Sequence, residues 1–421
     1  MEFTRRKFIK TAFIGGVGAM LPIPSWASSN KVAESTNPNY AKLDKVLQEP
    51  VFKKELFRSP VIIETLELLR YQNDFICRVR STDGAEGYSF GNNDQMKSLF
   101  PIFVNRMQDF FIGKDARDLE SLLDQVFVYQ SNYKLQGLAL WIPLATIEFA
   151  ILDMLGRIAN KPMGDLIGTV RNDTIAVYQA NSERYISAEL TIEHLQQELA
   201  KTKAKAIKFK LGGRMNHPET PVGRSEKLIP LVRKTFGDDM FICADANGSY
   251  DDVKEAIRIG KLMEEYKYDF FEEPVPFDWY EETKQVADAV NIPIAGGEQE
   301  PSMHNFRWLL ANDGLQIVQA DMFYFGGMIR SMKVARMAEA MGKRHVPHVS
   351  GIGYIYMMHF ISAIPNAGPF HEYKSFNLDF PFECKTSSLV PENGVVRVPT
   401  GPGLGIDIDP DYIKKHTVIT L

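Results

Sequence analysis

The strongest constraint on the fold is a recurrence of short apolar runs that begins near residue 175 and repeats about every 27 residues. Eight such runs are present, at 175–180, 206–210, 241–245, 269–273, 293–298, 316–321, 344–348 and 368–372. Amphipathic stretches with the helical period separate them, among them 191–204, 225–235, 251–266 and 329–341. Strands alternating with helices predict an α/β fold whose parallel sheet closes as a (β/α)8-type TIM barrel.

An open, doubly wound sheet is the alternative arrangement of such units. It is disfavoured because no Gly-x-Gly-x-x-Gly turn follows the first predicted strand, as it would in a dinucleotide-binding fold. We therefore assign residues 171–383 to the barrel.

The rest of the chain does not follow this repeat. Residues 41–170 contain a predicted strand pair within 60–80, a turn-rich loop at 83–87 and predicted helices at 100–111, 118–129 and 144–157. This composition predicts an N-terminal α+β domain. The last segment, 384–421, has no place in the barrel repeat, and we expect it to pack on that domain and complete it.

The N-terminus has the pattern of an export signal. Arg5 and Arg6 precede a short apolar stretch that ends before small residues at Ser25 and Ala27. Paired arginines in this setting indicate a twin-arginine signal over residues 1–27, followed by a flexible leader over 28–40. A basic N-terminal helix that lies on a membrane is the alternative. We expect a periplasmic or exported protein with no stable membrane association after the signal is cleaved.

Composition excludes several classes of protein. Apolar residues make up 45% and charged residues 24% of the 421 residues, which is ordinary for a globular protein. The formal net charge is −5, and it becomes −8 without the +3 of residues 1–27, so no nucleic-acid partner is expected. Three scattered cysteines support neither a disulfide scaffold nor a thiolate metal site.

Ionisable residues end seven consecutive predicted strands, starting with the second. They are Lys208 and Lys210, then Asp245, Glu272, Glu298, Asp321, His348 and Glu372. Barrel strands are buried on both faces, so a charge on one is costly unless it is paired or binds a metal ion. A helix cap or a solvated strand end would explain one such residue but not seven in succession. Because active sites of barrel enzymes lie at the carboxyl ends of the strands, we expect one site there.

Three of these carboxylates predict a metal site. Asp245, Glu272 and Glu298 end successive predicted strands, 27 and 26 residues apart. Neighbouring strands lie about 4.8 Å apart, so the three groups can share one cation. An all-oxygen site favours Mg²⁺, with Mn²⁺ as an alternative, over Zn²⁺. Glu273 is the competing ligand, but strand alternation predicts that it points to the opposite face and caps or pairs behind the barrel.

Two further groups are candidate proton carriers. Lys208 and Lys210 share a strand face, and repulsion between close ammonium groups is expected to lower the pKa of one or both. A lysine-rich solvated edge is the alternative, because lysines also occupy positions 201, 203 and 205. Asp321 and His348 end adjacent strands, where the carboxylate can orient the imidazole. His345 is the rival histidine, but His348 stands nearer the mouth.

Taken in order, these motifs match a known pattern. They are Lys-Phe-Lys at 208–210, Asp-Ala-Asn at 245–247, Phe-Glu-Glu-Pro at 271–274, Ile-Ala-Gly-Gly-Glu at 294–298, Asp321 five residues before Gly326-Gly327, Pro347-His348 and His-Glu-Tyr at 371–373. Outside the barrel, 147–156 and 399–405 also match. Over about residues 60–415 the chain resembles the enolase superfamily, specifically the mandelate racemase-like group of the mandelate racemase/muconate lactonizing enzyme family. Asp321 stands where the muconate-cycloisomerase-like group has a lysine at this strand end.

The resemblance implies a capping domain over a modified (β/α)7β barrel, one Mg²⁺ that chelates the substrate carboxylate, and assembly as a homo-oligomer. It also implies roles for individual residues: Asp245, Glu272 and Glu298 as metal ligands, Lys210 as a base on one face of the substrate, Lys208 as the neighbour that lowers its pKa, His348 oriented by Asp321 on the opposite face, Glu372 as a hydrogen-bonding partner of the substrate carboxylate, and Asn247 as a substrate contact. The loop 83–93 is a candidate specificity segment, with Tyr88, Phe90 and Asn92 as candidate substrate contacts.

The predicted chemistry is removal of the proton next to a carboxylate through an enediolate, which a divalent cation stabilises. With a second base opposite, loss of a β-hydroxyl would dehydrate a sugar acid to a 2-keto-3-deoxy acid, and the resemblance favours this reaction. Racemisation or epimerisation of a 2-hydroxy acid is the alternative. A non-catalytic periplasmic sugar-acid-binding protein is a remote third reading, which would predict a damaged set of site residues. In each case the partner is a small-molecule carboxylate.

Overall fold

The structure, a computed structural model, describes residues 37–215, 217–349, 351–374 and 381–420. The predicted signal over 1–27 and most of the predicted leader lie outside these residues. The end of the predicted leader is helical, however, because helix α1 (Asn39–Leu47) begins inside it. Asn39 donates to the carbonyl of Ala311 over 2.9 Å, and the Arg307 guanidinium lies 4.1 Å from the ring of Tyr40. These contacts fix the start of the helix.

The predicted parallel barrel is confirmed. All eight predicted strands are present: β4 (Thr174–Ala180), β5 (Ala206–Lys210), β6 (Phe241–Asp245), β7 (Phe270–Glu272), β8 (Ile294–Gly296), β9 (Ile317–Val318), β10 (Arg344–His345) and β11 (His371–Tyr373). They pair in sequence order from β4 to β10, and β11 pairs with β4. Backbone hydrogen bonds from His345 to Asn366 and from Gly368 to His345 link β10 to the segment before β11.

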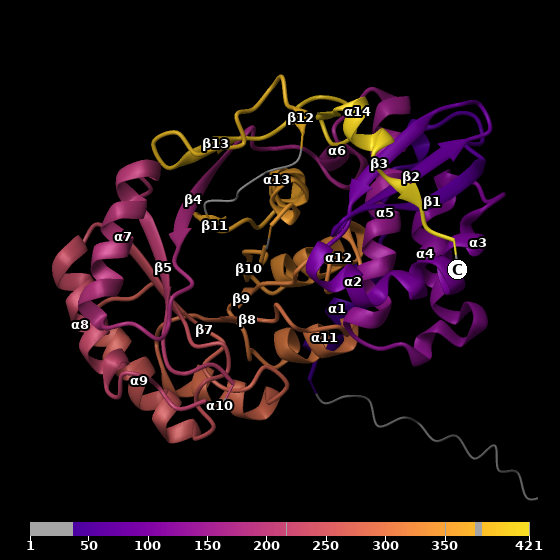
Figure 1. The fold of residues 1–421 in the computed structure, drawn as a ribbon. Helices are drawn as coiled ribbons and strands as arrows, with labels where there is room; N and C mark the ends of the chain where they lie inside the picture. The colour runs from indigo at the N-terminus through magenta and orange to yellow at the C-terminus, as the bar shows by residue number, and fades with distance from the viewer. Residues whose placement is uncertain (1–36, 216, 350, 375–380, 421) are drawn as a thin grey trace, which may run out of the picture. The chain divides into compact units, whose positions relative to one another are not determined.

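Seven helices follow the first seven of these strands, as the (β/α)7β form requires. They are α7 (Ala188–Thr202), α8 (Arg224–Phe236), α9 (Val253–Glu265), α10 (Tyr280–Ala289), α11 (Met303–Ala311), α12 (Met328–Ala340) and α13 (Gly353–Ala363). Figure 1 shows α7 to α10 on the outer side of strands β4 to β8. On β5, Ile207 and Phe209 pack with residues of these helices, whereas Ala206 belongs to a separate cluster of strand residues. This alternation turns Lys208 and Lys210 away from the helices.

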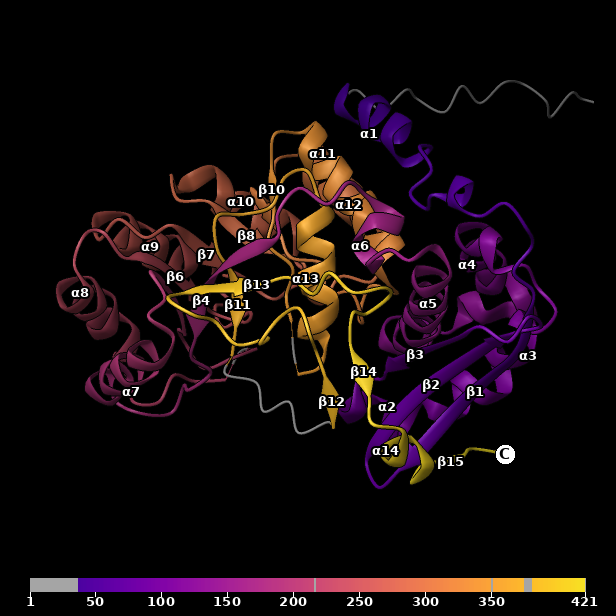
Figure 2. The same cartoon turned by 90° about the horizontal axis from the view of Figure 1, so that it is seen from above.

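The N-terminal α+β part contains an antiparallel sheet in the order β15-β1-β2-β3. Its strands are β1 (Ile63–Tyr71), β2 (Asp74–Ser81), β3 (Glu86–Phe90) and β15 (Thr417–Val418), and its helices are α2 (Asn93–Ile102), α3 (Asp109–Phe111), α4 (Leu119–Val128), α5 (Leu138–Ala159) and α6 (Met163–Ile167). The predicted helix over 100–111 forms the later part of a longer helical stretch. In Figure 2, α5 lies between this sheet and the barrel helices α12 and α13.

The prediction of a loop over residues 83–93 is wrong for its central part, because residues 86–90 form strand β3. Short side chains permit this strand to approach α5 closely: a Cβ at Gly87 would lie 2.3 Å from the carbonyl oxygen of Ala150. Ser89, the next residue on the same face, donates to the carbonyl of Thr146 over 2.6 Å. Small residues in this segment therefore serve the close packing of β3 on α5 as well as the turn before it.

The C-terminal segment contacts both parts of the molecule. Strand β15 pairs with β1, and Tyr412 in helix α14 (Pro410–Lys414) donates to Asp74 over 2.6 Å. Strand β13 (Val395–Arg397), however, pairs with the barrel strand β4, and β12 (Phe382–Glu383) pairs with β14 (Asp407–Ile408). The segment therefore adds to the barrel sheet as well as to the N-terminal domain, which the strand repeat did not predict.

Helix α5 is the core of the N-terminal part. It is long and apolar enough to cross a membrane, but 89% of its most apolar window is buried inside the protein. Its two buried acids reach across to other segments: Glu148 accepts from the amide of Ile329 at the start of α12, and Asp153 accepts from the amide of Leu404, both over 2.8 Å. Gly327 is required beside Glu148, because its φ is +112° and a Cβ would overlap the carboxylate.

We predict that Glu148 makes stability fall as pH rises. Burial raises its pKa to about 8, from an ordinary value of 4.5. The folded protein therefore keeps this proton over a range in which the unfolded chain has released it, and the associated stability is lost as pH rises through about 8. Glu148→Gln cannot ionise. The melting temperature of this variant, minus that of wild type, should therefore rise by several degrees as the pH is raised from about 5 to about 9.

The control for this measurement is Glu64→Gln, at an exposed position of β1. Its melting temperature should keep a constant offset from wild type over the same pH range. A constant offset for Glu148→Gln as well would contradict the assignment.

Candidate active site

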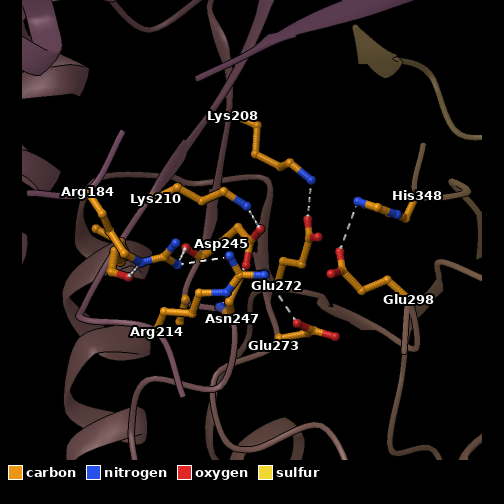
Figure 3. Close-up of polar contacts among 12 residues, drawn as sticks. Arg184, Lys208, Lys210, Arg214, Asp245, Asn247, Glu272, Glu273, Glu298 and His348 are labelled. Carbon is orange, nitrogen blue, oxygen red and sulfur yellow. Dashed lines mark hydrogen bonds and ion pairs between the residues drawn. The ribbon is translucent and has the colours of Figure 1, made fainter. Parts of the chain in front are cut away.

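The predicted site residues come together because neighbouring barrel strands are in register. Asp245 lies directly opposite Lys210 on β5 and opposite Glu272 on β7. Glu298 follows β8, Asp321 follows β9 and His348 follows β10, while Glu372 lies within β11. Figure 3 shows six of them converging on one region: Lys208, Lys210, Asp245, Glu272, Glu298 and His348.

The three predicted metal ligands form a buried cluster. Asp245, Glu272 and Glu298 each offer an oxygen within 4.8 Å of the others. Burial, followed by the charge of Asp245, raises the pKa of Glu272 to about 7. Burial also disfavours the charged form of Asp245, but Lys210 and Lys208 outweigh it and lower its pKa to about 2. Glu272 thus resists ionisation because it is buried and lies beside the charged Asp245.

The residues fit a hard divalent cation. Oxygen Oε1 of Glu272 is buried without a hydrogen-bond partner among the described residues. A cation among the three carboxylates would satisfy this oxygen and offset their repulsion. The donor set contains only carboxylate oxygens, which suits Mg²⁺ or Mn²⁺ better than Zn²⁺.

Both lysines of β5 are paired with these acids. Lys208 donates to Glu272 over 2.7 Å and lies 3.4 Å from Glu372, while Lys210 donates to Asp245. Burial opposes the charged form of Lys208, but Glu272 and Glu372 outweigh it and hold its pKa well above the ordinary value. The pKa of Lys208 is therefore not the one that is lowered, because two carboxylates lie against its ammonium group.

The predicted pair of Asp321 and His348 is present. Nδ1 of His348 lies 2.7 Å from Asp321, and Nε2 lies 3.6 Å from Glu298. Asp321 is itself fixed by the amides of Phe323 and Tyr324, which donate over 2.7 and 3.1 Å. Burial opposes the charged form of His348, but Glu298 and Asp321 raise its pKa overall. Nε2, the nitrogen that Asp321 does not hold, faces the carboxylate cluster.

The rival histidine has a different setting. His345 is fully buried against the ring of Phe360, and burial lowers its pKa to about 3. A neutral, enclosed imidazole is a core residue, and the structure keeps it apart from the pair of Asp321 and His348.

Glu273 departs from the expected orientation. Strand alternation placed it behind the barrel, but its φ of +42° breaks the alternation. Its carboxylate instead lies 3.4 Å from the Asn247 amide, and burial and Glu298 raise its pKa well above the ordinary value. Asn247 also accepts from Arg184 over 3.0 Å. Arg184, in the loop after β4, gave no signal in the sequence.

Two other placements differ from expectation. Tyr88 lies on β3, where its hydroxyl donates to Glu86 over 2.8 Å, and none of its hydrogen bonds within the described residues reaches the strand-end cluster. Lys374, which the sequence analysis missed, lies 3.1 Å from Glu372. It stands two residues after Glu372, so the spacing that linked Lys208 to Lys210 could have found it.

Several known proteins are similar to this chain. Arabinonate dehydratase of Saccharolobus solfataricus is 27% identical over 347 residues, which cover 80% of this chain and 89% of that protein. The crystal structure of the 3,6-anhydro-D-galactonate cycloisomerase of Zobellia galactanivorans matches with a TM-score of 0.70 and 27% identity, covering 86% of this chain and all of that one.

A mandelate racemase/muconate lactonizing protein of Paracoccus denitrificans PD1222, solved in complex with magnesium, shares the fold. Its TM-score is 0.77 at 23% identity, over 86% of this chain and 99% of that one. A sequence profile of the family described as "Enolase C-terminal domain-like" matches residues 191–412, more than half of the chain. The chain therefore belongs to the mandelate racemase/muconate lactonizing enzyme-like family of the enolase superfamily.

Proposed function

We propose that this protein is an acid-sugar dehydratase, which removes the proton α to a carboxylate and expels the β-hydroxyl to give a 2-keto-3-deoxy acid. One observation carries the proposal: Lys210 lies on one side of the acidic cluster, on β5, and His348 lies on the other side, after β10. Two proton carriers on opposite sides of one carboxylate-binding centre suit a reaction in which one group takes a proton and the other gives one. The similarity to arabinonate dehydratase supports the substrate class.

Asp245, Glu272 and Glu298 would hold the cation. Their carboxylate oxygens favour Mg²⁺, with Mn²⁺ as the alternative. When bound, it supplies positive charge that stabilises the negative charge developing on the substrate carboxylate.

The protein's own groups then position and move protons. Lys210 would hold or take a proton at Nζ, and His348 would do so at Nε2, because Asp321 occupies Nδ1. Asn247, fixed by Arg184, would present its amide to a substrate hydroxyl. Racemisation of a 2-hydroxy acid needs the same two groups, and it differs only in where the second proton is delivered.

Removing one ligand should remove metal binding. Glu298→Gln leaves two carboxylates and a weaker neutral donor, so we expect its affinity for Mn²⁺ to fall at least about 100-fold. Titration calorimetry with Mn²⁺ measures this directly. Glu281→Gln, an exposed substitution of the same charge, should bind as wild type does. Unchanged binding by Glu298→Gln would refute the assigned ligand set.

The reaction can be found by screening acid sugars with Mg²⁺ for 2-keto-3-deoxy products. We expect Lys210→Ala and His348→Asn each to lower kcat by about 10²–10⁴ on the substrate found. In D2O, the variant that retains the base should still exchange the α-proton of the substrate for deuterium, although it forms no product. The residue that is intact in that variant is then the base.

Two results would contradict dehydration. Exchange of the α-proton by wild type without a 2-keto acid would indicate a racemase or epimerase. Binding of sugar acids without exchange or product, equal in wild type and Lys210→Ala, would indicate a binding protein.

We also propose that residues 1–27 direct export by the twin-arginine route, on the strength of Arg5 and Arg6 before the apolar stretch. Residues 1–40 fused to a folded fluorescent reporter should carry it to the periplasm of a bacterium that has this pathway. Changing both arginines to lysine should leave the reporter in the cytoplasm. Export that is insensitive to this change would refute the route.

A further inference from the structure

A pocket lies apart from the strand-end cluster and shares no residue with it. Its volume is about 510 Å³, and it is bounded by α4, the turn after α4, the start of α5 and residues 301–305. Pockets of roughly 300–1,000 Å³ with mainly apolar walls and a few polar groups are typical small-molecule sites. The walls of this pocket include the apolar side chains of Leu123, Phe127, Leu140 and Trp141, and the charged side chain of Arg330.

The guanidinium of Arg330 packs against two aromatic rings. Its Cζ lies 3.7 Å from the ring centroid of Trp141 and 4.6 Å from that of Phe325. Nε donates to the carbonyl of Phe325 over 2.7 Å, and Nη2 donates to that of Pro301 over 3.4 Å. Nη1 has no hydrogen-bond partner among the described residues. The contacts therefore fix the plane of the group and leave one nitrogen available to a ligand.

The charge of Arg330 is not balanced by an ion pair in the described part of the chain. Burial lowers its pKa to about 10, so the group stays charged at neutral pH. Burial also raises the pKa of Glu148, one of the acids that act on it, to about 8, which leaves that acid protonated. The other, Asp124, is exposed on α4. A guanidinium in this setting favours a carboxylate, which its planar fork can bind with two hydrogen bonds.

The turn after α4 has a strained backbone at the edge of the pocket. Gln130 and Ser131 have φ values of +45° and +61°, which are costly for residues other than glycine. Asn132 holds this conformation, because it is fully buried and donates to the carbonyl of Val126 over 2.9 Å. The turn thereby places Tyr133 in the pocket wall with 46% of it exposed. Strain that a buried anchor maintains is common at ligand-binding sites.

We infer that this pocket binds a small aromatic monocarboxylate, whose carboxylate pairs with Arg330 and whose ring lies against Trp141 and Tyr133. Aromatic walls favour a ring over an aliphatic chain, because ring pairs gain from stacked or edge contacts. One guanidinium balances one carboxylate, and Asp124 in the pocket wall disfavours a second negative charge. The inference does not depend on the proposed function.

The competing account gives Arg330 a structural role only. Its two hydrogen bonds join Phe325, four residues after Asp321, to Pro301, three residues after Glu298. This tie would steady both segments without any ligand. The two accounts differ in whether the pocket takes up a carboxylate.

The probe is 2-naphthoate, a planar aromatic carboxylate, and 2-naphthylmethanol is its neutral counterpart. Calorimetry in EDTA, which keeps metal ions from the acidic cluster, should show 2-naphthoate binding to wild type at least about 10-fold more tightly than the alcohol. In Arg330→Met, Kd for 2-naphthoate should rise about 10- to 100-fold, the range expected for losing one charge-assisted hydrogen bond. Kd for the alcohol should change less than about threefold.

Two control variants locate the binding. Lys385→Met, which removes an exposed charge paired with Asp407, should bind 2-naphthoate as wild type does. Glu298→Gln should also match wild type, because the strand-end cluster takes no part. A changed Kd in Glu298→Gln would place the probe in the active site and overturn the proposal.

A second measurement keeps Arg330 in place. In protein labelled with 5-fluorotryptophan, the fluorine resonance that Trp141→Phe removes belongs to Trp141. This resonance should shift as 2-naphthoate is added, and it should saturate with the calorimetric Kd. An unchanged resonance, a wild-type Kd in Arg330→Met, or a wild type that does not bind 2-naphthoate would each leave Arg330 with the structural role alone.

Discussion

Mutual repulsion of three buried carboxylates is the constraint around which this site is organised. Strand register forces Asp245 and Glu272 into neighbouring positions, and Glu298 is brought within 4.8 Å of both. Such a cluster is stable only where positive charge lies close by. The lysines of β5 supply part of that charge, each pairing with one of the acids, and a divalent cation would supply the remainder. Metal binding and the stability of the barrel mouth are therefore linked.

The same need for charge balance extends around the mouth. Glu372 lies between two lysines, and His348 lies between Asp321 and Glu298. Neutralising any one of these charged groups would therefore change the pKa values of its neighbours. The pKa of Lys208 is an example, because the charges of Glu272 and Glu372 raise it although burial lowers it.

Sequence alone predicted the barrel well because its signal is a repeat: each strand is short, apolar and about 27 residues from the next. It also predicted which strand-end residues share the mouth, since parallel strands bring their carboxyl ends together. It failed where local geometry departs from the average. Glu273 escapes strand alternation through a positive φ, and β3 was mistaken for a loop because glycine there serves packing.

Other misses have a different cause. The pKa of Lys208 depends on partners that are 64 and 164 residues away in the chain, so no local pattern reports it. Lys374 carried a period-two signal that went unused. Arg184 comes from a loop, where neither periodicity nor spacing gives information, and only its hydrogen bond to Asn247 reveals it.

The placement of the last residues has a consequence for biosynthesis. Strand β15 pairs with β1 near the other end of the chain, where Thr417 contacts Arg70 across 347 residues of sequence, and β13 adds to the first barrel strand. Neither sheet can be completed until residues 395–418 have left the ribosome, long after β1 and β4 have done so. Until then the apolar helix α5 lacks part of its cover, including the amide of Leu404 that Asp153 binds.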